Sequence, residues 1–416
     1  MNGIFSLNLR HLDALTVIGR AGSMSAAVQQ VNLSQPALAQ AVGKIEGLLG
    51  ERLFDRHPAG MVPTAAGRIV LMRVERALRY LLHGVRLLRR SARLAPGEHL
   101  ERRVTMAQLR ALIAVESTSS YALAAEQTGL SQPAVHRAVR DLQDLLGIAL
   151  LVRVGRAVRP TDAANRFVRF ARLMLSELRA GMDEIGALGT SDSGRVTVGT
   201  LPLARAIFLP ELLARFTAAH PGASVEVVEA PYGELLTTLR QGDIDLLIGT
   251  QRDPSPTSDV TQEGLFDDDP VIVGRAAHPL CGKQELTLPD LLEFPWVIPS
   301  PGVPMRGNWE RMFRDRGIEP PRLRIECGSV LIMRGLMLQG DWLTLMSRDQ
   351  FLFERGVGAL AELGDPGPAL RRRIAMTHRS DWRPTPLQAH FVDLARALAR
   401  ERGQDMPSSS RLYRTQ

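Results

Sequence analysis

The motif Ser34-Gln35-Pro36-Ala37 occurs twice in this chain, the second time as Ser131-Gln132-Pro133-Ala134. Around the motif, residues 9–66 align without a gap with residues 106–163, and 21 of the 58 aligned positions are identical. In both copies the serine is a favoured helix N-cap, and the proline falls in the first turn, where its missing N–H is not needed. A helix is therefore predicted to begin at each motif, and one structural unit is present twice.

The residues on either side of each motif complete this unit. An apolar stripe predicts an opening helix, with Leu12, Leu15 and Ile18 in the first copy and Leu109, Leu112 and Val115 in the second. A short helix over 23–30 and 120–127 then ends at Asn32 or Gly129, which tolerate the left-handed conformation. Stretches with hairpin character, 53–62 and 150–158, follow the motif helix. The pattern predicts a winged helix-turn-helix, which lays its second helix in a DNA major groove.

The second helix of each unit leaves a polar face free, and arginines border each hairpin. Such side chains can bind phosphates or base edges. The candidate DNA-binding residues are Ser34, Gln35, Pro36, Gln40, Lys44 and Arg56 in the first unit, and Ser131, Gln132, Pro133, His136, Arg137, Arg140, Arg153 and Arg156 in the second. The second face is the more cationic, so if one unit is degenerate we expect it to be the first. The alternative is a helical structural domain with a solvated polar face.

Charge is distributed unevenly along the chain. Residues 1–190 hold 25 Lys and Arg against 15 Asp and Glu, a net +10, whereas residues 191–416 hold 26 against 29, a net −3. A basic first half favours a polyanionic partner, because neutralising phosphates releases condensed counterions. Double-stranded DNA is therefore the expected partner of the repeated units.

Membrane, secretory and catalytic functions find no support in the sequence. No apolar run approaches the roughly 18 residues of a membrane span, and the start lacks the order of a secretory signal. Cys281 and Cys327 have no CxxC spacing, and the histidines have no ligand spacing, so we expect no metal and no cofactor. No nucleophile elbow or phosphate loop is present. We expect a cytoplasmic, nucleoid-associated protein that is not an enzyme.

The repeated unit resembles the DNA-binding domain of the LysR-type transcriptional regulators. The first copy has the family's Ser-Gln-Pro-Ala helix start, its Leu-Gly helix end, and the wing and exit residues Leu53-Phe54-Asp55-Arg56 and Thr64-Ala65-Ala66-Gly67. The second copy departs from the pattern, with Leu151 for the phenylalanine and Asn165 near the missing exit glycine. The family usually has one winged helix, whereas this chain has two in tandem. The resemblance implies a transcription regulator.

A long amphipathic helix is predicted after each hairpin, over residues 65–94 and 162–188. Apolar residues give each helix a seam, formed by Leu71, Leu78, Leu82 and Val85 in the first and by Phe167, Phe170, Leu173, Met174 and Leu178 in the second. In the LysR family such a linker helix pairs two protomers, so the resemblance implies a homodimer or homotetramer. The alternative is that each seam packs only onto its own winged helix.

Strands alternate with helices in the second half of the chain. Strands are predicted at 195–199, 225–229 and 246–249, with helices at 203–219 and 234–241 between them, which gives a parallel doubly wound sheet. The region resembles the type 2 periplasmic-binding-protein fold of LysR-type effector domains, in Gly242-Asp243-Ile244-Asp245 and in the turn His278-Pro279-Leu280. This resemblance implies an α/β domain of two subdomains around a cleft.

Candidate effector-binding residues follow from this fold. Ligands of such sheets bind beyond the carboxyl ends of the strands, which selects Thr200, Leu201, Pro202, Gly249 and Thr250. Helix starts attract anions, which adds Arg306, after the proline-rich loop 299–305, and Ser329. A hydroxyl, a guanidinium and a helix-start donor suit a carboxylate or a sugar-derived acid. The alternatives are an ordinary ion pair for Arg306 and helix capping for Thr200 and Ser329.

The proline-rich loop with Arg306, together with Ser347-Arg348-Asp349, resembles the LysR branch that regulates galactose-binding-protein and protocatechuate-pathway genes. The chain is predicted to be multi-domain, with the boundaries 1–67 (first winged helix), 68–100 (linker helix and connection), 101–163 (second winged helix), 164–192 (second linker helix), 193–403 (effector domain) and 404–416 (disordered tail). The predicted function is a regulator that binds DNA and a small anionic metabolite. The alternative is an enzyme or metabolite-binding protein on the same α/β fold, with the helical repeats used for oligomerisation.

Overall fold

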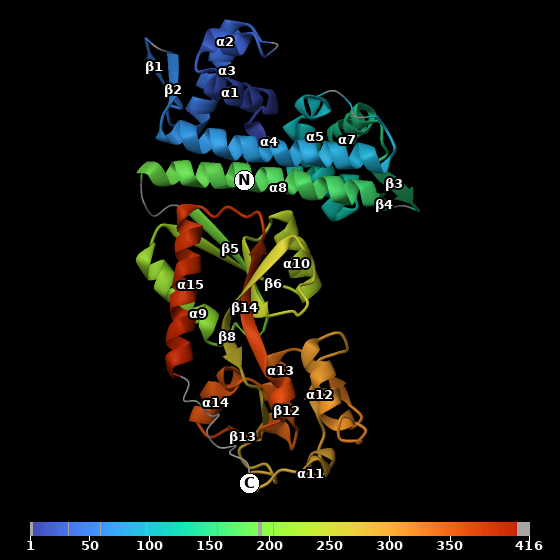
Figure 1. Cartoon of the computed structure of the whole chain (residues 1–416). Helices are drawn as coiled ribbons and strands as arrows, with labels where there is room; N and C mark the ends of the chain where they lie inside the picture. The colour runs from blue at the N-terminus through green and yellow to red at the C-terminus, as the bar shows by residue number, and fades with distance from the viewer. Residues whose placement is uncertain are drawn as a thin grey trace.

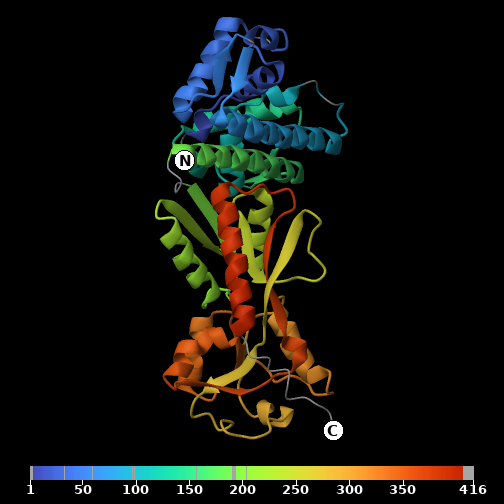
Figure 2. The same ribbon diagram turned by 60° about the vertical axis from the view of Figure 1, so that its left-hand side comes forward.

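The computed structural model describes residues 3–405, apart from residues 32, 59, 96, 98, 156, 190–193 and 203. Figure 1 shows two small helical units, a pair of long helices that crosses the molecule, and below them an α/β domain of two subdomains. Figure 2 shows the same vertical order after a turn of the molecule. Asn32, Arg156 and the tail beyond residue 405 lie outside the described residues. Helix α15 (Pro386–Asp405) continues past residue 404, where the tail was expected to begin.

Each helical unit is a winged helix-turn-helix, as predicted. A short 3-10 turn precedes each unit, η1 (Ile4–Ser6) and η2 (Leu100–Arg103). The first unit contains α1 (Leu9–Ala21), α2 (Met24–Val28), α3 (Gln35–Leu49) and the antiparallel hairpin of β1 (Phe54–His57) and β2 (Gly60–Pro63). The second contains α5 (Met106–Thr118), α6 (Tyr121–Thr128), α7 (Gln132–Leu146) and the antiparallel hairpin of β3 (Leu151–Val154) and β4 (Ala157–Pro160).

The repeated motif begins each second helix in the way that its residues predict. The Ser34 hydroxyl accepts the Ala37 N–H at 3.4 Å, and the Ser131 hydroxyl accepts the Ala134 N–H at 3.4 Å. The α2 helix is shorter than expected. The first hairpin is also held by a hydrogen bond that the motif did not predict. The Glu46 carboxylate accepts the Leu53 N–H at 2.8 Å, which ties the end of α3 to the first hairpin.

Two long helices run side by side and antiparallel, α4 (Ala65–Ser91) and α8 (Asp162–Gly189). Small residues allow their close approach. A Cβ at Gly84 would lie 2.8 Å from the Cβ of Phe170, and a Cβ at Gly181 would lie 3.1 Å from the Cβ of Arg73. The buried residues of both helices and of both winged helices form one continuous apolar core.

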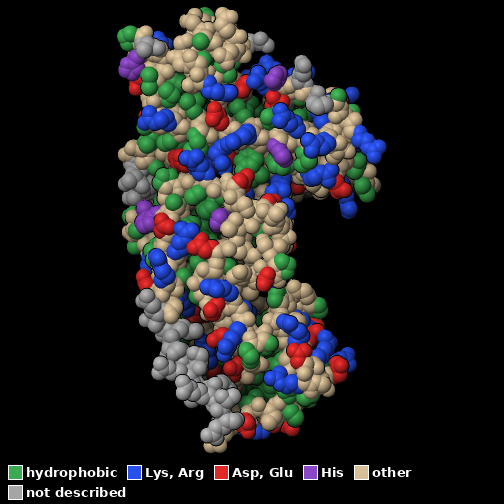
Figure 3. All heavy atoms as spheres, viewed as in Figure 1, with side chains coloured by type: hydrophobic (Ala, Val, Ile, Leu, Met, Phe, Trp, Pro, Cys, Tyr) green, Lys and Arg blue, Asp and Glu red, His purple; other side chains and the backbone are tan. Residues whose placement is uncertain are grey.

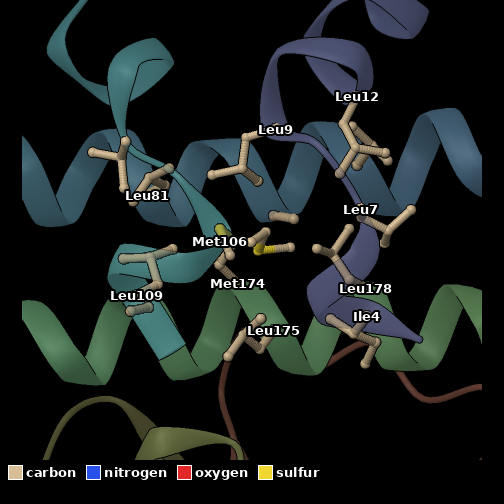
Figure 4. Packing of buried hydrophobic residues seen from close by; sticks show 14 of the residues in the cluster. Ile4, Leu7, Leu9, Leu12, Leu81, Met106, Leu109, Met174, Leu175 and Leu178 are labelled. Atoms are coloured by element: carbon tan, nitrogen blue, oxygen red, sulfur yellow. The ribbon is translucent and has the colours of Figure 1, made fainter. Parts of the chain in front are cut away.

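This pairing corrects the predicted partner of each seam. The seam of α4 packs against α8 of the same chain as well as against its own winged helix. The buried stripe of α4 is also displaced from Leu71, Leu78 and Leu82, and consists of Val70, Val74, Ala77, Leu81, Val85 and Leu88. Figure 4 shows the starts of α1 and α5 meeting between the two long helices, where Leu9 and Leu12 of α1 lie near Met106 and Leu109 of α5.

The upper subdomain of the α/β domain contains a five-stranded sheet in the order β6-β5-β7-β14-β8. Its strands are β5 (Gly194–Thr200), β6 (Ala223–Glu229), β7 (Leu246–Thr250), β8 (Val260–Asp268) and β14 (Arg372–Arg379), and its helices are α9 (Phe208–Ala219), α10 (Tyr232–Gln241) and α15. The three predicted strands are parallel, as expected, and the sheet is completed by β14 and β8, of which β14 is antiparallel to both β7 and β8. The helix expected from residue 203 begins at Phe208.

The lower subdomain is inserted between β8 and β14, so the chain crosses twice between the subdomains. Its strands are β9 (Val271–Arg275), β10 (Val297–Ile298), β11 (Ile325–Glu326), β12 (Thr344–Met346) and β13 (Leu360–Gly364). Its helices are α11 (Leu288–Leu292), α12 (Pro304–Arg314), α13 (Val330–Gln339) and α14 (Leu352–Gly356), with 3-10 turns η3 (Arg348–Phe351) and η4 (Pro368–Leu370). The two-subdomain prediction is therefore confirmed. Within the described part of the chain, no helix is long and apolar enough to cross a membrane.

Candidate functional site

The two winged helices each present an exposed reading face, which we define as Gln35, Gln40, Gly43 and Lys44 of α3 and Gln132, His136, Arg137 and Arg140 of α7. All eight residues are exposed. Ser34, Pro36, Ser131 and Pro133 are also exposed, so the capping serines have polar atoms at the surface. Arg56 and Arg153 are exposed on the hairpins β1–β2 and β3–β4, next to the reading faces in the chain. The described candidates therefore lie at two surfaces, one on each unit.

The two reading faces differ in charge at equivalent positions. With the repeat offset of 97 residues, Gln40 corresponds to Arg137 and Gly43 corresponds to Arg140. A shallow hollow of about 460 Å³ lies along the second face, lined by Gln132, Pro133, His136, Arg137 and Arg140. Figure 3 shows Lys and Arg side chains gathered at the end of the molecule where α7 and the β3–β4 hairpin lie. At the position after Gly43 the difference is reversed, because Lys44 corresponds to the exposed Asp141. The second face therefore has two arginines and a carboxylate where the first has a single lysine.

The α/β domain is fastened to the long helices by polar contacts. Arg172 of α8 pairs with Asp243 at 2.9 Å and with Glu116 of α5 at 3.0 Å. From α4, the Tyr80 hydroxyl donates to the Asp381 carboxylate at 2.5 Å. Gly242 ends α10 in the left-handed conformation, and a Cβ there would lie 3.1 Å from the Cβ of Ser176. The α/β domain is therefore joined directly to the helix pair against which both winged helices pack.

A cavity of about 450 Å³ lies at this junction and holds ionisable groups from both sides. Burial, and then the neighbouring Asp245 carboxylate, raise the pKa of Asp183 to about 6. Burial also raises the pKa of Asp245, whose carboxylate accepts the Thr197 N–H at 2.8 Å. Asp183 therefore keeps its proton to a higher pH than an exposed carboxylate does.

A cavity with a volume of about 1050 Å³ lies between the two subdomains. We call it the effector cavity. Prolines, methionines and Tyr232 supply an apolar lining, and the start of α13 reaches it through Gly328 and Val330. Concave, mostly apolar sites with a few convergent polar groups are typical of small-molecule binding.

Three arginines, Arg205, Arg252 and Arg372, line the effector cavity, and each has a buried guanidinium nitrogen without a hydrogen-bond partner among the described residues. Arg205 pairs with Glu229, and Arg372 pairs with Asp268 at 2.8 Å. The guanidinium of Arg252 pairs with no carboxylate of the described chain and lies 4.3 Å from the centre of the Tyr232 ring. The three guanidinium groups make this part of the lining cationic, which suits an anion.

The predicted effector-binding residues divide into two groups. Leu201, Pro202 and Thr250 line the effector cavity. Thr200 and Gly249 lie in the strands just before it, where the Thr200 side chain is fully buried and donates to the Leu201 carbonyl at 3.3 Å. Ser329 is exposed and precedes α13 without a side-chain capping bond. Neither Ser329 nor the two strand residues are part of the lining.

Arg306 also lies outside the lining, which corrects its predicted place in the cleft. Its guanidinium donates to Glu310 at 2.6 Å and to Glu326 at 2.9 Å. Two carboxylates therefore satisfy this cation, so it is the ion pair that the sequence left as the alternative. Two of the arginines that do line the cavity stand only a few residues beyond Pro202 and Thr250, and a search for basic residues just after the strand ends would have found them.

Two further kinds of site concern metal ions and cysteine thiols. Among the described residues, no group of three His, Cys, Asp or Glu side chains could hold a metal ion. Cys281 and Cys327 are free thiols.

Two family models match the chain. The model for the bacterial regulatory helix-turn-helix protein, lysR family, matches twice, at residues 9–68 and 106–165. The model for the LysR substrate binding domain matches residues 189–400. These ranges coincide with the two winged helices and with the α/β domain.

Named relatives agree with the family models. The HTH-type transcriptional regulator GalR of Pseudomonas putida is 32% identical over 394 residues, 95% of this chain and 98% of the relative. The HTH-type transcriptional regulator CfxR of Cupriavidus necator is 29% identical over 311 residues, 74% of this chain and 97% of the relative. The GalR alignment is long enough to include both repeated units.

Solved structures share the fold. Full-length OxyR from Pseudomonas aeruginosa, in a variant with one substitution, has a TM-score of 0.53 at 20% identity, over 71% of this chain and 94% of that chain. CbnR, a LysR family transcriptional regulator, has a TM-score of 0.51 at 22% identity, over 70% of this chain and 98% of that chain.

Proposed function

The chain belongs to the LysR family of DNA-binding transcriptional regulators, and we propose that its signal is a small carboxylate bound in the effector cavity. The observation that carries this proposal is the set of three arginines that line the cavity, of which Arg252 pairs with no carboxylate among the described residues. Relatives named as transcriptional regulators place the chain among regulators and not among enzymes.

The cavity chemistry favours an acid with a compact apolar body. Arg205, Arg252 and Arg372 provide three positive charges, whereas Glu229 and Asp253 are the acidic residues of the lining. The carboxylate of the ligand would be held mainly by Arg252, because the other two guanidinium groups already pair with protein carboxylates. Tyr232 and the lining prolines would pack against the rest of the ligand. The carboxylate or sugar-derived acid expected from the sequence fits this lining, with different arginines.

We predict that Arg252→Met weakens binding of the effector by roughly tenfold to a hundredfold, since hydrogen bonds to charged groups contribute about 1.5–3 kcal/mol. Methionine retains packing area against the Tyr232 ring. The measurement is calorimetric titration with an acid identified by a thermal-shift screen of metabolites.

Arg306→Met is the matched control for this prediction. Its affinity for the acid should stay within about twofold of wild type, because Glu310 and Glu326 occupy the guanidinium outside the cavity. Operator affinity without the acid should be unchanged in Arg252→Met, since the arginine is far in the chain from both reading faces. A loss of acid binding in Arg306→Met but not in Arg252→Met would contradict this assignment.

Operator binding should weaken steeply as salt rises. Lys44, Arg56, Arg137, Arg140 and Arg153 are exposed at or beside the reading faces. If about six phosphates are neutralised, the slope of log affinity against log salt is roughly −5, because each phosphate contributes about −0.9. The measurement is fluorescence anisotropy with a duplex selected from a random library, between about 50 and 200 mM salt. A flat profile would contradict phosphate-based binding.

Regulators of this family form oligomers. Because the seam between α4 and α8 is filled within one chain, we propose that a homodimer or homotetramer forms through surfaces outside it. We also propose that the protein acts in the cytoplasm, associated with the nucleoid, where its double-stranded DNA partner lies.

A further inference from the structure

The contacts between α4 and α8 obey the same repeat that relates the two winged helices. At the repeat offset of 97 residues, Gly84 is equivalent to Gly181, and Arg73 is equivalent to Phe170. The close approach of Gly84 to Phe170 is therefore the counterpart of the close approach of Gly181 to Arg73. Exchanging the two copies maps these two contacts onto each other, which indicates an approximate two-fold axis inside one chain.

Other contacts follow the same symmetry. Figure 4 shows Leu9 and Leu12 with their equivalents Met106 and Leu109, and Leu81 with its equivalent Leu178, around one centre. The 3-10 turns η1 and η2 also each contact the opposite winged helix. Asp13 of α1 pairs with Arg102 of η2 at 3.3 Å, and the guanidinium of Arg110 in α5 lies 5.1 Å from the centre of the Phe5 ring in η1.

One buried ion-pair cluster departs from the symmetry and favours the pairing of α4 with α8 over the pairing of either helix with a copy of itself. The Arg73 side chain is only 2% exposed and pairs with Glu177 at 2.8 Å and with Glu184. The residues of α4 equivalent to these two glutamates are Tyr80 and Leu87. A pair of two α4 helices would therefore bury Arg73 without a carboxylate, and a pair of two α8 helices would bury both glutamates without a cation. Uncompensated buried charge disfavours both of these alternatives.

We infer that one chain forms a complete two-headed DNA-binding unit, whose α3 and α7 read two unlike half-sites in inverted orientation on one duplex. The inference rests on the DNA-binding function stated above and goes beyond it in giving both units a role and in fixing the operator's design. A symmetric pair of identical winged helices would select a palindrome, whereas this unit selects two different halves.

The residues of the reading faces specify how the halves differ. Gln35 and Gln132 are equivalent, so both halves should share the base read at that position. Arg137 and Arg140 in the second face replace Gln40 and Gly43 in the first. Arginine binds guanine and glutamine binds adenine in the major groove. Lys44 of the first face can also bind guanine, and Asp141 stands at the equivalent position of α7. The two halves should therefore have their guanines at different positions.

The experiment attaches an iron-EDTA cleavage reagent to one wing at a time. His57 and Val154 are exposed, equivalent positions in the two hairpins. In the full chain with Cys281→Ser and Cys327→Ser, the reagent is attached to His57→Cys or to Val154→Cys, and the DNA is a duplex selected from a random library by the wild-type chain. The expected result is cleavage beside one half from the first wing and beside the other half from the second.

Each other cleavage pattern has a defined meaning. Cleavage at both halves by either probe would overturn the inference, because it shows two copies of the same unit on the duplex. Cleavage by one probe alone, with binding retained, would also overturn it, because only one unit then contacts DNA. Failure of the wild-type chain to select any duplex would instead contradict the DNA-binding function itself. A duplex with one half duplicated as a palindrome should bind roughly tenfold or more weakly, and equal binding would contradict unlike half-sites.

A second measurement tests whether the pairing lies within one chain. Gly84→Cys with Phe170→Cys places the two thiols close together. The Cβ positions would be 2.8 Å apart, so the helices need to separate by only about 1 Å to reach the Cβ separation of about 3.5–4.5 Å that a disulfide spans. On the same cysteine-free background, oxidation should give a cross-linked monomer on a denaturing gel. A cross-linked dimer would show that α4 pairs with α8 of another chain and would overturn the inference.

Discussion

Arg73→Met should lower the free energy of unfolding of the winged-helix and linker unit by about 3–5 kcal/mol, the loss expected when one partner of a buried ion pair is removed. The Glu177 and Glu184 side chains are 8% and 9% exposed, so both carboxylates would remain buried after the cation is gone. Arg76 would still pair with Glu177 at 2.8 Å. Glu184 would therefore be the carboxylate left without a cation. Arg73 also donates to the Arg383 carbonyl at 3.0 Å, so the junction with the α/β domain should loosen.

Guanidinium denaturation followed by circular dichroism measures this effect, since the winged-helix and linker unit contributes much of the helix signal. Arg79→Met on the exposed side of the same helix is the matched control and should change the stability by less than about 0.5 kcal/mol. The combined variant Arg73→Met, Glu177→Gln and Glu184→Leu removes the charges together and should recover most of the loss. Equal effects of Arg73→Met and Arg79→Met would show that the buried cluster does not stabilise the seam.

The helix starts of both units could be predicted because capping is local. Ser34 and Ser131 cap α3 and α7 whatever surrounds them, and the proline after each can stand only near a helix start. The repeat then doubled the signal, since a pattern preserved in two copies is a stronger observation than either copy alone.

The partner of each long helix could not be predicted from its apolar stripe. Periodicity identifies a buried face but not what covers it, and many arrangements bury the same stripe. The informative signal was the charge that interrupts the stripe. Arg73 stands among the buried residues of α4, and Glu177 and Glu184 stand two turns apart on α8. Opposite charges on two otherwise apolar faces indicate that the faces meet.

The segments that approach the effector cavity were predicted better than its cations. Leu201, Pro202 and Thr250 line the cavity because the ends of parallel strands meet at one edge of the sheet. Arg306 was predicted from its place at a helix start, but Glu310 lies four residues further along the same helix and pairs with it. A glutamate four residues along a helix can pair with an arginine, so a place at a helix start did not show that Arg306 binds the effector.

Arg137→Ala and Arg140→Ala should each reduce operator affinity by about 1–3 kcal/mol, which corresponds to roughly fivefold to 150-fold. Both side chains are exposed on α7, along the hollow that also contains Gln132 and His136. Gln40→Ala in the first face should cause a smaller loss, because an uncharged amide makes weaker contacts with DNA than a guanidinium. The measurement is anisotropy titration at one fixed salt concentration with the selected duplex.

Specificity separates base reading from simple attraction. If Arg137 or Arg140 binds a guanine, its alanine variant should lose discrimination at one base pair of the α7 half while the α3 half keeps its full specificity. If the side chain binds only phosphate, affinity should fall equally for all sequences and the salt slope should drop by about 1. Arg324→Ala, an exposed arginine of the lower subdomain, is the control and should leave affinity and salt slope unchanged. A larger loss at Gln40 than at either arginine would show that the first unit dominates operator binding, contrary to this prediction.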